Sequence, residues 1–457
     1  MHRTQTSTNH QHTRISHYKN TFDSYSMFNL LTSDDLLDKV EVLLPNHRER
    51  LYPPTETLSI FLGQAMSADR SCQNSVNQVA TQRVIGGLSP PSTHTGGYCR
   101  ARRRLPEKMV SELARHLGQV IDQQTADSWR WKSRRVRIVD GTTVTMPDTP
   151  SNQTLYPQQN RQREGLGFPI CRVVGITCLS SGALLNAAVG PFKGKGGDEQ
   201  TLVRSIQDTL EAGDILMGDA YYASYFFIAD MQAKGVDILM EQYGARRRST
   251  DFRKGKRLGS KDHIIEIEKS KTRPDWMSEE DYRLAPDSVF IREFKVGGKT
   301  MVTTIHCPKY ASKDELKQLY KSRWHIELDI RHIKDSMGMG ILSCKTPEMV
   351  IKEMWVYFLA YNLIRFLVIK SALLADICPR TISFKHCMQL WLSWSQQATM
   401  LSEDQMAILF MLIAQQTVGK RPGRAEPRAL KRRAKPYPLL KQHRHLARAE
   451  VQQNGHP

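Results

Sequence analysis

The chain has 457 residues, a length typical of about three domains, and its 40% of hydrophobic residues are enough to form a large core. The formal net charge of +19 indicates a polyanionic partner, most commonly nucleic acid, and no amphipathic basic helix or lipid-attachment motif favours a membrane surface instead. The eight cysteines form no CxxC pair, which disfavours a zinc ribbon or a disulfide framework and predicts a cytoplasmic location.

The first part of the chain is predicted to be helical. We expect a flexible polar arm at residues 1–24 and a helical DNA-binding region at residues 25–130. The segment 85–106 opens as a loop rich in Gly, Pro and Ser and ends in the start of a basic helix. Its four arginines repel one another unless an anion is near, so we expect phosphate contacts, although a solvated basic turn has the same pattern. These arginines are Arg100, Arg102, Arg103 and Arg104.

Strands and helices alternate at residues 131–242, which we expect to be the first part of an α/β core. Strands are predicted at 136–139, 168–179, 183–192, 215–217 and 236–242, and helices at 198–210 and 224–235. The first strand is expected to end at Asp140, before a turn and a second short β-branched run. This order of elements predicts a mixed sheet.

A β-rich insertion is predicted at residues 243–310, after a basic loop. Its strands are expected at 263–269, 288–298 and 299–307, the last two joined as a hairpin. The second part of the core is expected at 311–395, and a C-terminal helix with a basic tail at 396–457.

One apolar run, residues 354–370, is almost long enough to cross a membrane. Asn362 and Arg365 interrupt it, and a membrane span needs about 20 predominantly apolar residues. We therefore predict a buried core helix.

Two aspartates lie where short apolar strands are predicted to end. Asp140 occurs in IVDGTTV and Asp219 in MGDAYY, each among small or polar neighbours. Strand ends of α/β sheets are places where side chains converge on a site. A single aspartate at such a position is more often a turn or capping residue, so position alone leaves both interpretations open.

The segment YKSRWHIELDIRHIKDS at 320–336 combines acids and bases in one predicted helix. At about 100° per residue, four polar side chains fall on a stripe roughly 60° wide that borders an apolar face. These four are Tyr320, Arg323, Glu327 and Lys334. The side chains expected at the surface are His325, Asp329 and Asp335. An ordinary amphipathic helix with an i,i+4 ion pair would explain Glu327 but not the rest of the stripe, so the spacing leaves both possibilities open.

The spacing Tyr320-x2-Arg323-x3-Glu327-x6-Lys334 resembles the Y-R-E-K signature of IS4-type DDE transposases. Asp140 in IVDGTTV resembles the first catalytic aspartate of that family, and Asp219 in MGDAYY resembles the second. Further similarities extend the resemblance over most of the chain, at 96–106, 353–365 and 421–438.

The resemblance implies an RNase H-like mixed-sheet core that is interrupted by a β-rich insertion. It also implies that Asp140, Asp219 and Glu327 are catalytic and hold two divalent ions, Mg²⁺ or Mn²⁺. Arg323 and Lys334 are then expected to hold DNA phosphates, and the Tyr320 hydroxyl to bond a phosphate oxygen.

We therefore expect a DNA transposase that binds terminal inverted repeats, cleaves the element ends and joins the 3′-OH to target DNA by two-metal phosphoryl transfer. The expected partners are end and target DNA and a second copy of the chain in a synaptic dimer, on the bacterial nucleoid. Neither a membrane nor a nucleotide cofactor is expected, because the sequence has no P-loop. Three alternatives are an RNase H-like nuclease that does not join strands, a non-catalytic DNA-binding derivative and a basic nucleoid protein.

Related enzymes stack an aromatic residue of the insertion on a flipped base. The strands near the signature contain Phe290 and Phe294, and Trp276 lies in a turn-like segment. The sequence assigns this role to none of them, so a hairpin-forming cleavage pathway remains an open question.

Overall fold

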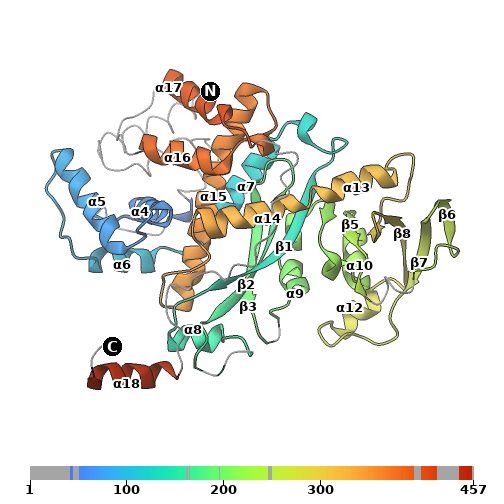
Figure 1. Ribbon diagram of the computed structural model, residues 1–457, viewed down its shortest axis with the longest axis horizontal. Helices are drawn as coiled ribbons and strands as arrows, with labels where there is room; N and C mark the ends of the chain where they lie inside the picture. Colours follow the sequence, from blue (N-terminus) through green and yellow to red (C-terminus); the bar gives the residue numbers. More distant parts are fainter. Residues whose placement is uncertain are drawn as a thin grey trace.

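The computed structural model describes residues 42–44, 51–160, 163, 165–194, 196–244, 250–395, 403–418 and 442–454. The arm expected at 1–24 and the motif at 421–438 lie outside these residues. A central sheet lies among helices, with the helices of residues 54–104 at one end of the molecule and the strands of residues 256–296 at the opposite end (Figure 1).

A nine-stranded sheet runs through the described part of the chain in the order β3-β2-β1-β4-β5-β9-β8-β7-β6. The first five strands are β1 (Val136–Thr145), β2 (Ile170–Cys178), β3 (Leu184–Pro191), β4 (Ile215–Met217) and β5 (Asp237–Glu241). The first three pair antiparallel, whereas β4 is parallel to β1 and β5 is parallel to β4. The predicted α/β class with a mixed sheet is confirmed.

The expected turn after Asp140 is wrong, because β1 continues without a break to Thr145. Asp140 lies opposite Gly175 of β2, in the middle of the paired register. The residues that follow, Thr142 to Val144, are β-branched and favour an extended strand. The glycine in the DGTT motif therefore does not make a turn.

The strands predicted in the insertion are present, but they continue the core sheet. They are β7 (Asp262–Glu268), β8 (Ser288–Val296) and β9 (Lys299–Thr303), with α12 (Glu279–Leu284) between β7 and β8. A fourth strand, β6 (Lys256–Gly259), forms where a basic loop was expected. β9 pairs antiparallel with β5, which joins the two groups of strands. Gly297 and Gly298 have φ of 57° and 81°, as a two-residue hairpin turn requires.

The described N-terminal residues are helical, as predicted. The helices are α4 (Pro54–Met66), α5 (Cys72–Ile85), α6 (Gly96–Arg104) and α7 (Glu107–Gln123). The core also contains α8 (Pro150–Leu155), α9 (Glu199–Arg204) and α10 (Tyr225–Ala233). The helix predicted at 198–210 is shorter than expected, because a separate 3-10 turn forms at Gln207–Thr209.

The apolar run at 354–370 belongs to α15 (Pro347–Ala375), which is long and apolar enough to cross a membrane, but 78% of its most apolar window is buried inside the protein. It packs against α4, α7 and α17 (Glu403–Gln415). The Asn362 amide donates to the carbonyls of Ala114 (2.9 Å) and Leu184 (2.8 Å). The predicted core helix is thus confirmed, and its polar residue fastens it to α7 and β3.

The C-terminal part adds α16 (Phe384–Ser395) and α18 (Arg444–Asn454).

The segment 320–336 is not one helix. It comprises the end of α13 (Lys313–Lys321), then α14 (Trp324–Arg331) and a π-helical turn at His332–Ser336. Arg323 lies in the break, where its amide bonds the Tyr320 carbonyl at 3.0 Å in a tighter turn than the α-helix makes. The constant rotation of about 100° per residue, from which the stripe was predicted, therefore does not apply across the whole signature.

Asp329 was expected at the surface, and this prediction is wrong. Its side chain is fully buried, and Oδ1 accepts hydrogen bonds from Arg365 of α15 and from Arg380 (2.7 Å). The side of α14 that carries Asp329 is covered by α15 and by the segment around Arg380. The angular positions of residues along one helix cannot reveal such a cover. His325, which was also expected at the surface, is half-buried, and burial lowers its pKa to about 4. Asp335 is exposed, as predicted.

Candidate active site

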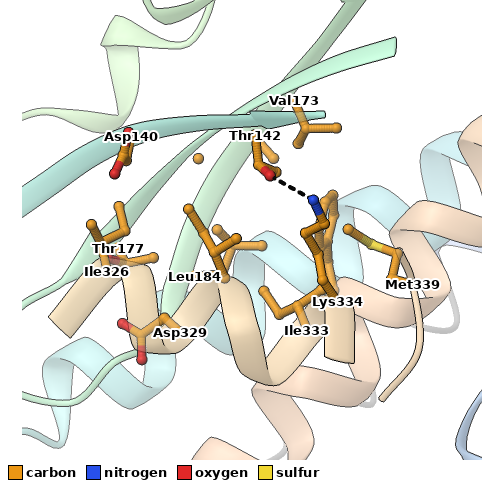
Figure 2. Close-up of a pocket in the computed structure, with 14 residues that line it drawn as sticks. Asp140, Thr142, Val173, Thr177, Leu184, Ile326, Asp329, Ile333, Lys334 and Met339 are labelled. Carbon is orange, nitrogen blue, oxygen red and sulfur yellow. Dashed lines mark hydrogen bonds between the residues drawn. The ribbon is translucent and has the colours of Figure 1, made fainter. Parts of the chain in front are cut away.

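Asp140 projects from β1 toward α14, on the face of the sheet that also carries Thr142 (Figure 2). Its Oδ1 accepts a hydrogen bond from the Gly141 amide at 2.8 Å. Its Oδ2 accepts one from Arg323 Nη1 at 3.3 Å. β1 therefore fixes the main chain at Asp140, and Arg323, immediately before α14, supplies a cation for its carboxylate.

Glu327 lies one turn after Arg323 on α14. The second terminal nitrogen of Arg323 donates to Glu327 Oε1 at 3.0 Å. A single guanidinium thus bridges Asp140 and Glu327, which are far apart in the sequence. Two carboxylates that converge on one positive charge form a place where a cation is electrostatically favoured.

Asp219 follows β4 and caps the short 3-10 helix Ala220–Tyr222. Its Oδ1 accepts a hydrogen bond from the Tyr221 amide at 2.8 Å. Its negative charge raises the pKa of Asp140, so the two carboxylates lie within electrostatic reach of each other. β1 and β4 are adjacent parallel strands, which places both aspartates in the same part of the sheet.

The pKa of the Asp140 carboxyl is raised to about 6. Burial is the main cause, because it disfavours the charged form, and the charges of Asp219 and Glu199 act in the same direction. The Gly141 amide and Arg323 lower the pKa but do not offset these effects. The site therefore favours additional positive charge.

Tyr320 and Lys334, the other two signature residues, are both bonded to the strands that carry the aspartates. The Tyr320 hydroxyl donates to the Gly218 carbonyl at 3.3 Å, and burial raises its pKa to about 12. Lys334 Nζ donates to Thr142 Oγ1 at 3.1 Å (Figure 2) and to the Thr143 carbonyl at 2.8 Å. Tyr320, Arg323 and Lys334 are thus each bonded to a segment that carries Asp140 or Asp219.

A cavity of about 30 Å³ lies between α14 and the sheet, beneath Asp140 and Lys334. Its walls are mainly apolar, with Ile326, Ile333 and Leu184 among the side chains that surround it (Figure 2). This volume is enough for about one water molecule. The cavity is therefore too small to be a pocket for a substrate as large as a nucleotide.

Glu199, the first residue of α9, contacts the segments that carry both aspartates. A Cβ placed on Gly141 would lie within 2.4 to 2.8 Å of the Glu199 carboxylate, so a larger residue beside Asp140 would force the Glu199 side chain to move. Glu199 also accepts a hydrogen bond from Tyr222, in the turn after Asp219, at 3.1 Å. The glycine of the DGTT motif was the sequence signal for this close contact.

The arginine cluster of α6 is divided between surface and core. Three of the arginines are exposed, so for them phosphate contact stays a prediction: Arg100, Arg103 and Arg104. Arg102 is only 8% exposed, and its guanidinium lies over the rings of Phe61 and Tyr98. The expected DNA contact by Arg102 is a mistake, because α6 is amphipathic and turns this side chain inward.

The aromatic residues of the insertion differ in accessibility. Phe294 is fully buried, whereas Phe290 is 53% exposed. Trp276 is half-exposed and lies 3.9 Å over the guanidinium of Arg204. Burial removes Phe294 as a stacking candidate and leaves the other two open.

No group of three acidic, histidine or cysteine side chains in the described residues is close enough together to hold a metal ion. The carboxylates of Asp140, Asp219 and Glu327 nevertheless provide the hard oxygen donors that Mg²⁺ and Mn²⁺ prefer. The guanidinium of Arg323 already places one positive charge between Asp140 and Glu327. The donor chemistry therefore fits a divalent ion, provided that Arg323 moves aside.

Comparison with known proteins places this site in context. A family model described as the transposase DDE domain matches residues 131–363, just over half of the chain. The transposase InsG for insertion sequence element IS4 of Escherichia coli K12 is 26% identical over 343 residues, covering 74% of this chain and 75% of InsG. The InsZ protein of the same organism is 25% identical over 136 residues, which cover 30% of this chain and 44% of InsZ.

Proposed function

Because the chain belongs to the IS4 family of DDE transposases, we propose that it binds the terminal inverted repeats of an insertion sequence, cleaves the element ends and joins the resulting 3′-OH to target DNA. The observation that carries this proposal is the guanidinium of Arg323 shared by Asp140 and Glu327, with Asp219 in electrostatic reach. These residues are the two strand-end aspartates, together with the acid and one of the bases of the signature.

An RNase H-like core is part of this proposal. The order β3-β2-β1-β4-β5, with three antiparallel strands followed by two parallel ones, supports it. Asp140 on the central strand and Asp219 after the neighbouring strand then present their carboxylates to α14. In this arrangement, residues 243–310 form the insertion between the second aspartate and Glu327.

Asp140, Asp219 and Glu327 would hold two divalent ions, Mg²⁺ or Mn²⁺. When bound, such ions activate a water or 3′-OH and stabilise the leaving oxygen of phosphoryl transfer. Because the pKa of Asp140 is raised, its carboxyl holds a proton more readily than an ordinary aspartate does. A bound cation would favour the ionised form instead. Metal binding is thus coupled to loss of a proton near neutral pH.

Arg323 would exchange partners when DNA binds. Its two terminal nitrogens now bond Asp140 and Glu327, and the same planar fork can bond two oxygens of a phosphate. Lys334 holds its ammonium against β1 and would act as a point charge for a flanking phosphate. The Tyr320 hydroxyl would bond a phosphate oxygen after leaving the Gly218 carbonyl.

The helical region at 25–130 would bind DNA through the exposed Arg100, Arg103 and Arg104. Recognition of two element ends requires two copies of the site, so we propose a homodimer in the synaptic complex. The reaction would take place in the cytoplasm on nucleoid DNA.

The test is an in vitro reaction of the purified chain with Mg²⁺ and DNA that carries the ends flanking its own gene. Glu327→Gln should abolish cleavage and joining while the protein still binds the ends. Asp335→Asn is the matched control, because this acid of the same segment is exposed. Undiminished cleavage by Glu327→Gln would refute the assignment of the site. Cleavage without joining would favour the nuclease alternative.

A further inference from the structure

Arg70 connects the helical N-terminal region with the signature. It lies between α4 and α5 with φ of 56°, a left-handed conformation that non-glycine residues rarely adopt. Its Nη1 donates a hydrogen bond to the carbonyl of Gly338 at 2.9 Å, across 268 positions of sequence. The strained backbone therefore accompanies a specific contact with the turn that follows Lys334.

The contact between Arg70 and Gly338 is close on both sides. Gly338 has φ of 87°, and a Cβ placed on it would lie 1.9 Å from Nη2 and 2.0 Å from Cζ of Arg70. The guanidinium thus occupies the space that any other side chain would need. Position 338 requires glycine both for its backbone angle and for this packing.

The turn at 338–340 in turn holds Lys334. The amide of Met339 bonds the Ile333 carbonyl and the amide of Gly340 bonds the Lys334 carbonyl, both at 3.1 Å. A Cβ on Gly340 would lie 3.8 Å from Lys334 Cε, so the lysine stem runs along this glycine. The Leu342 amide bonds the Thr145 carbonyl at 3.1 Å, which ties the turn to the end of β1.

Gln64 of α4 connects Arg70 to α6. Its Nε2 donates to the Arg70 carbonyl at 2.7 Å. Its Oε1 accepts hydrogen bonds from the Tyr98 hydroxyl at 2.8 Å and from Arg102 Nη1 at 3.1 Å. The buried Arg102 thus belongs to the same network as Arg70, which gives it a structural purpose.

We propose that Arg70 is a positioning residue that clamps the 338–340 turn and thereby holds Lys334 against β1. The hydrogen bonds of Gln64 connect α6 to Arg70, and Arg70 in turn contacts the turn that follows Lys334. A lysine has a long flexible stem, so its aim depends on the packing of the stem and of the backbone that carries it. The inference rests on the proposed function only for the expected contact between Lys334 and DNA.

The test uses the full-length Arg70→Met variant, which retains an unbranched stem but cannot donate a hydrogen bond. Hydrogen exchange detected by mass spectrometry should show roughly tenfold faster exchange of the amides within 333–343, because their turn has lost a charged hydrogen bond. Exchange in β2 and β3 should not change. Arg283→Ala, at an exposed arginine of α12, is the matched control.

A second readout measures the reaction. Arg70→Met should slow end cleavage roughly tenfold or more, because small misplacements of a substrate-positioning group have large effects. Its affinity for end DNA should change far less, because many phosphate contacts share the binding. If the variant does not fold, Arg70→Lys, which retains one donor, should give intermediate values in both measurements.

Two results are decisive. Unchanged exchange at 333–343 in a folded Arg70→Met protein would overturn the positioning role, because a contact that only stabilises the N-terminal helices does not loosen this turn selectively. Failure of the unmodified protein to cleave the ends would overturn the proposed function instead. The exchange measurement would still decide the role of Arg70, because it needs neither metal nor DNA.

Discussion

The ionised carboxylate of Asp140 should destabilise the metal-free protein. Folding raises the pKa of this group from its ordinary value of 3.8 to about 6, mainly through burial. The folded state therefore binds more protons than the unfolded state between these values, and stability falls as pH rises through them. At neutral pH the full effect corresponds to about 3 kcal/mol, at about 1.4 kcal/mol for each pKa unit.

The perturbation that isolates this effect is Asp140→Asn, which retains the shape and an acceptor oxygen but cannot ionise. The stability of the variant relative to the unmodified protein should increase by about 2 kcal/mol between about pH 4.5 and about pH 7.5. Urea unfolding in the presence of EDTA measures this difference. Mg²⁺ should stabilise the unmodified protein and not the variant.

The matched control is Asp335→Asn, an exposed acid whose replacement should give no such dependence on pH. A relative stability of Asp140→Asn that stays constant over this pH interval would refute the reasoning. In that case, either the carboxylate is better solvated than its burial indicates or Arg323 compensates its charge fully.

Three further predictions concern other parts of the structure. Asp329→Asn should lower the free energy of unfolding by about 3 kcal/mol or more in urea titrations, because it leaves two buried arginines without their counter-charge. Gly141→Ala should destabilise by about 1 to 3 kcal/mol and weaken Mn²⁺ binding in calorimetry, and a compensating Glu199→Ala should restore part of the stability. Arg102→Ala should lower the melting temperature without reducing the salt dependence of DNA binding, whereas Arg103→Ala should reduce that salt dependence and leave the melting temperature unchanged.

Local sequence patterns predicted most elements of the core. Period-two and β-branched runs located β2, β3, β5 and β7, and the interrupted apolar run correctly predicted a buried α15. Side-chain periodicity is a property of neighbouring residues, so it is visible without a partner. The same periodicity could not reveal that the strands of the insertion continue the core sheet through β9, because that pairing joins distant segments.

The geometry predicted for the signature was wrong, because residues 320–336 do not form one continuous helix. Spacing grouped Arg323 with Glu327, and the structure adds Asp140 as the second acid on the same guanidinium. The break at Arg323 and the π-helical turn around Lys334 depend on tertiary packing. A constant-angle wheel therefore placed Asp329 at the surface, although it is bonded to two arginines in the interior.

Residue types and their spacing along the chain were enough to identify the family, the order of the three acids and the α/β class. The pairing of charges became visible only in the folded chain. Folding turned Arg102 into the core and left Arg103 exposed, brought Glu199 against Gly141, and placed Arg70 on the turn after Lys334. The physical reason is that burial and ion pairing arise from contacts between segments distant in sequence, which no local pattern encodes.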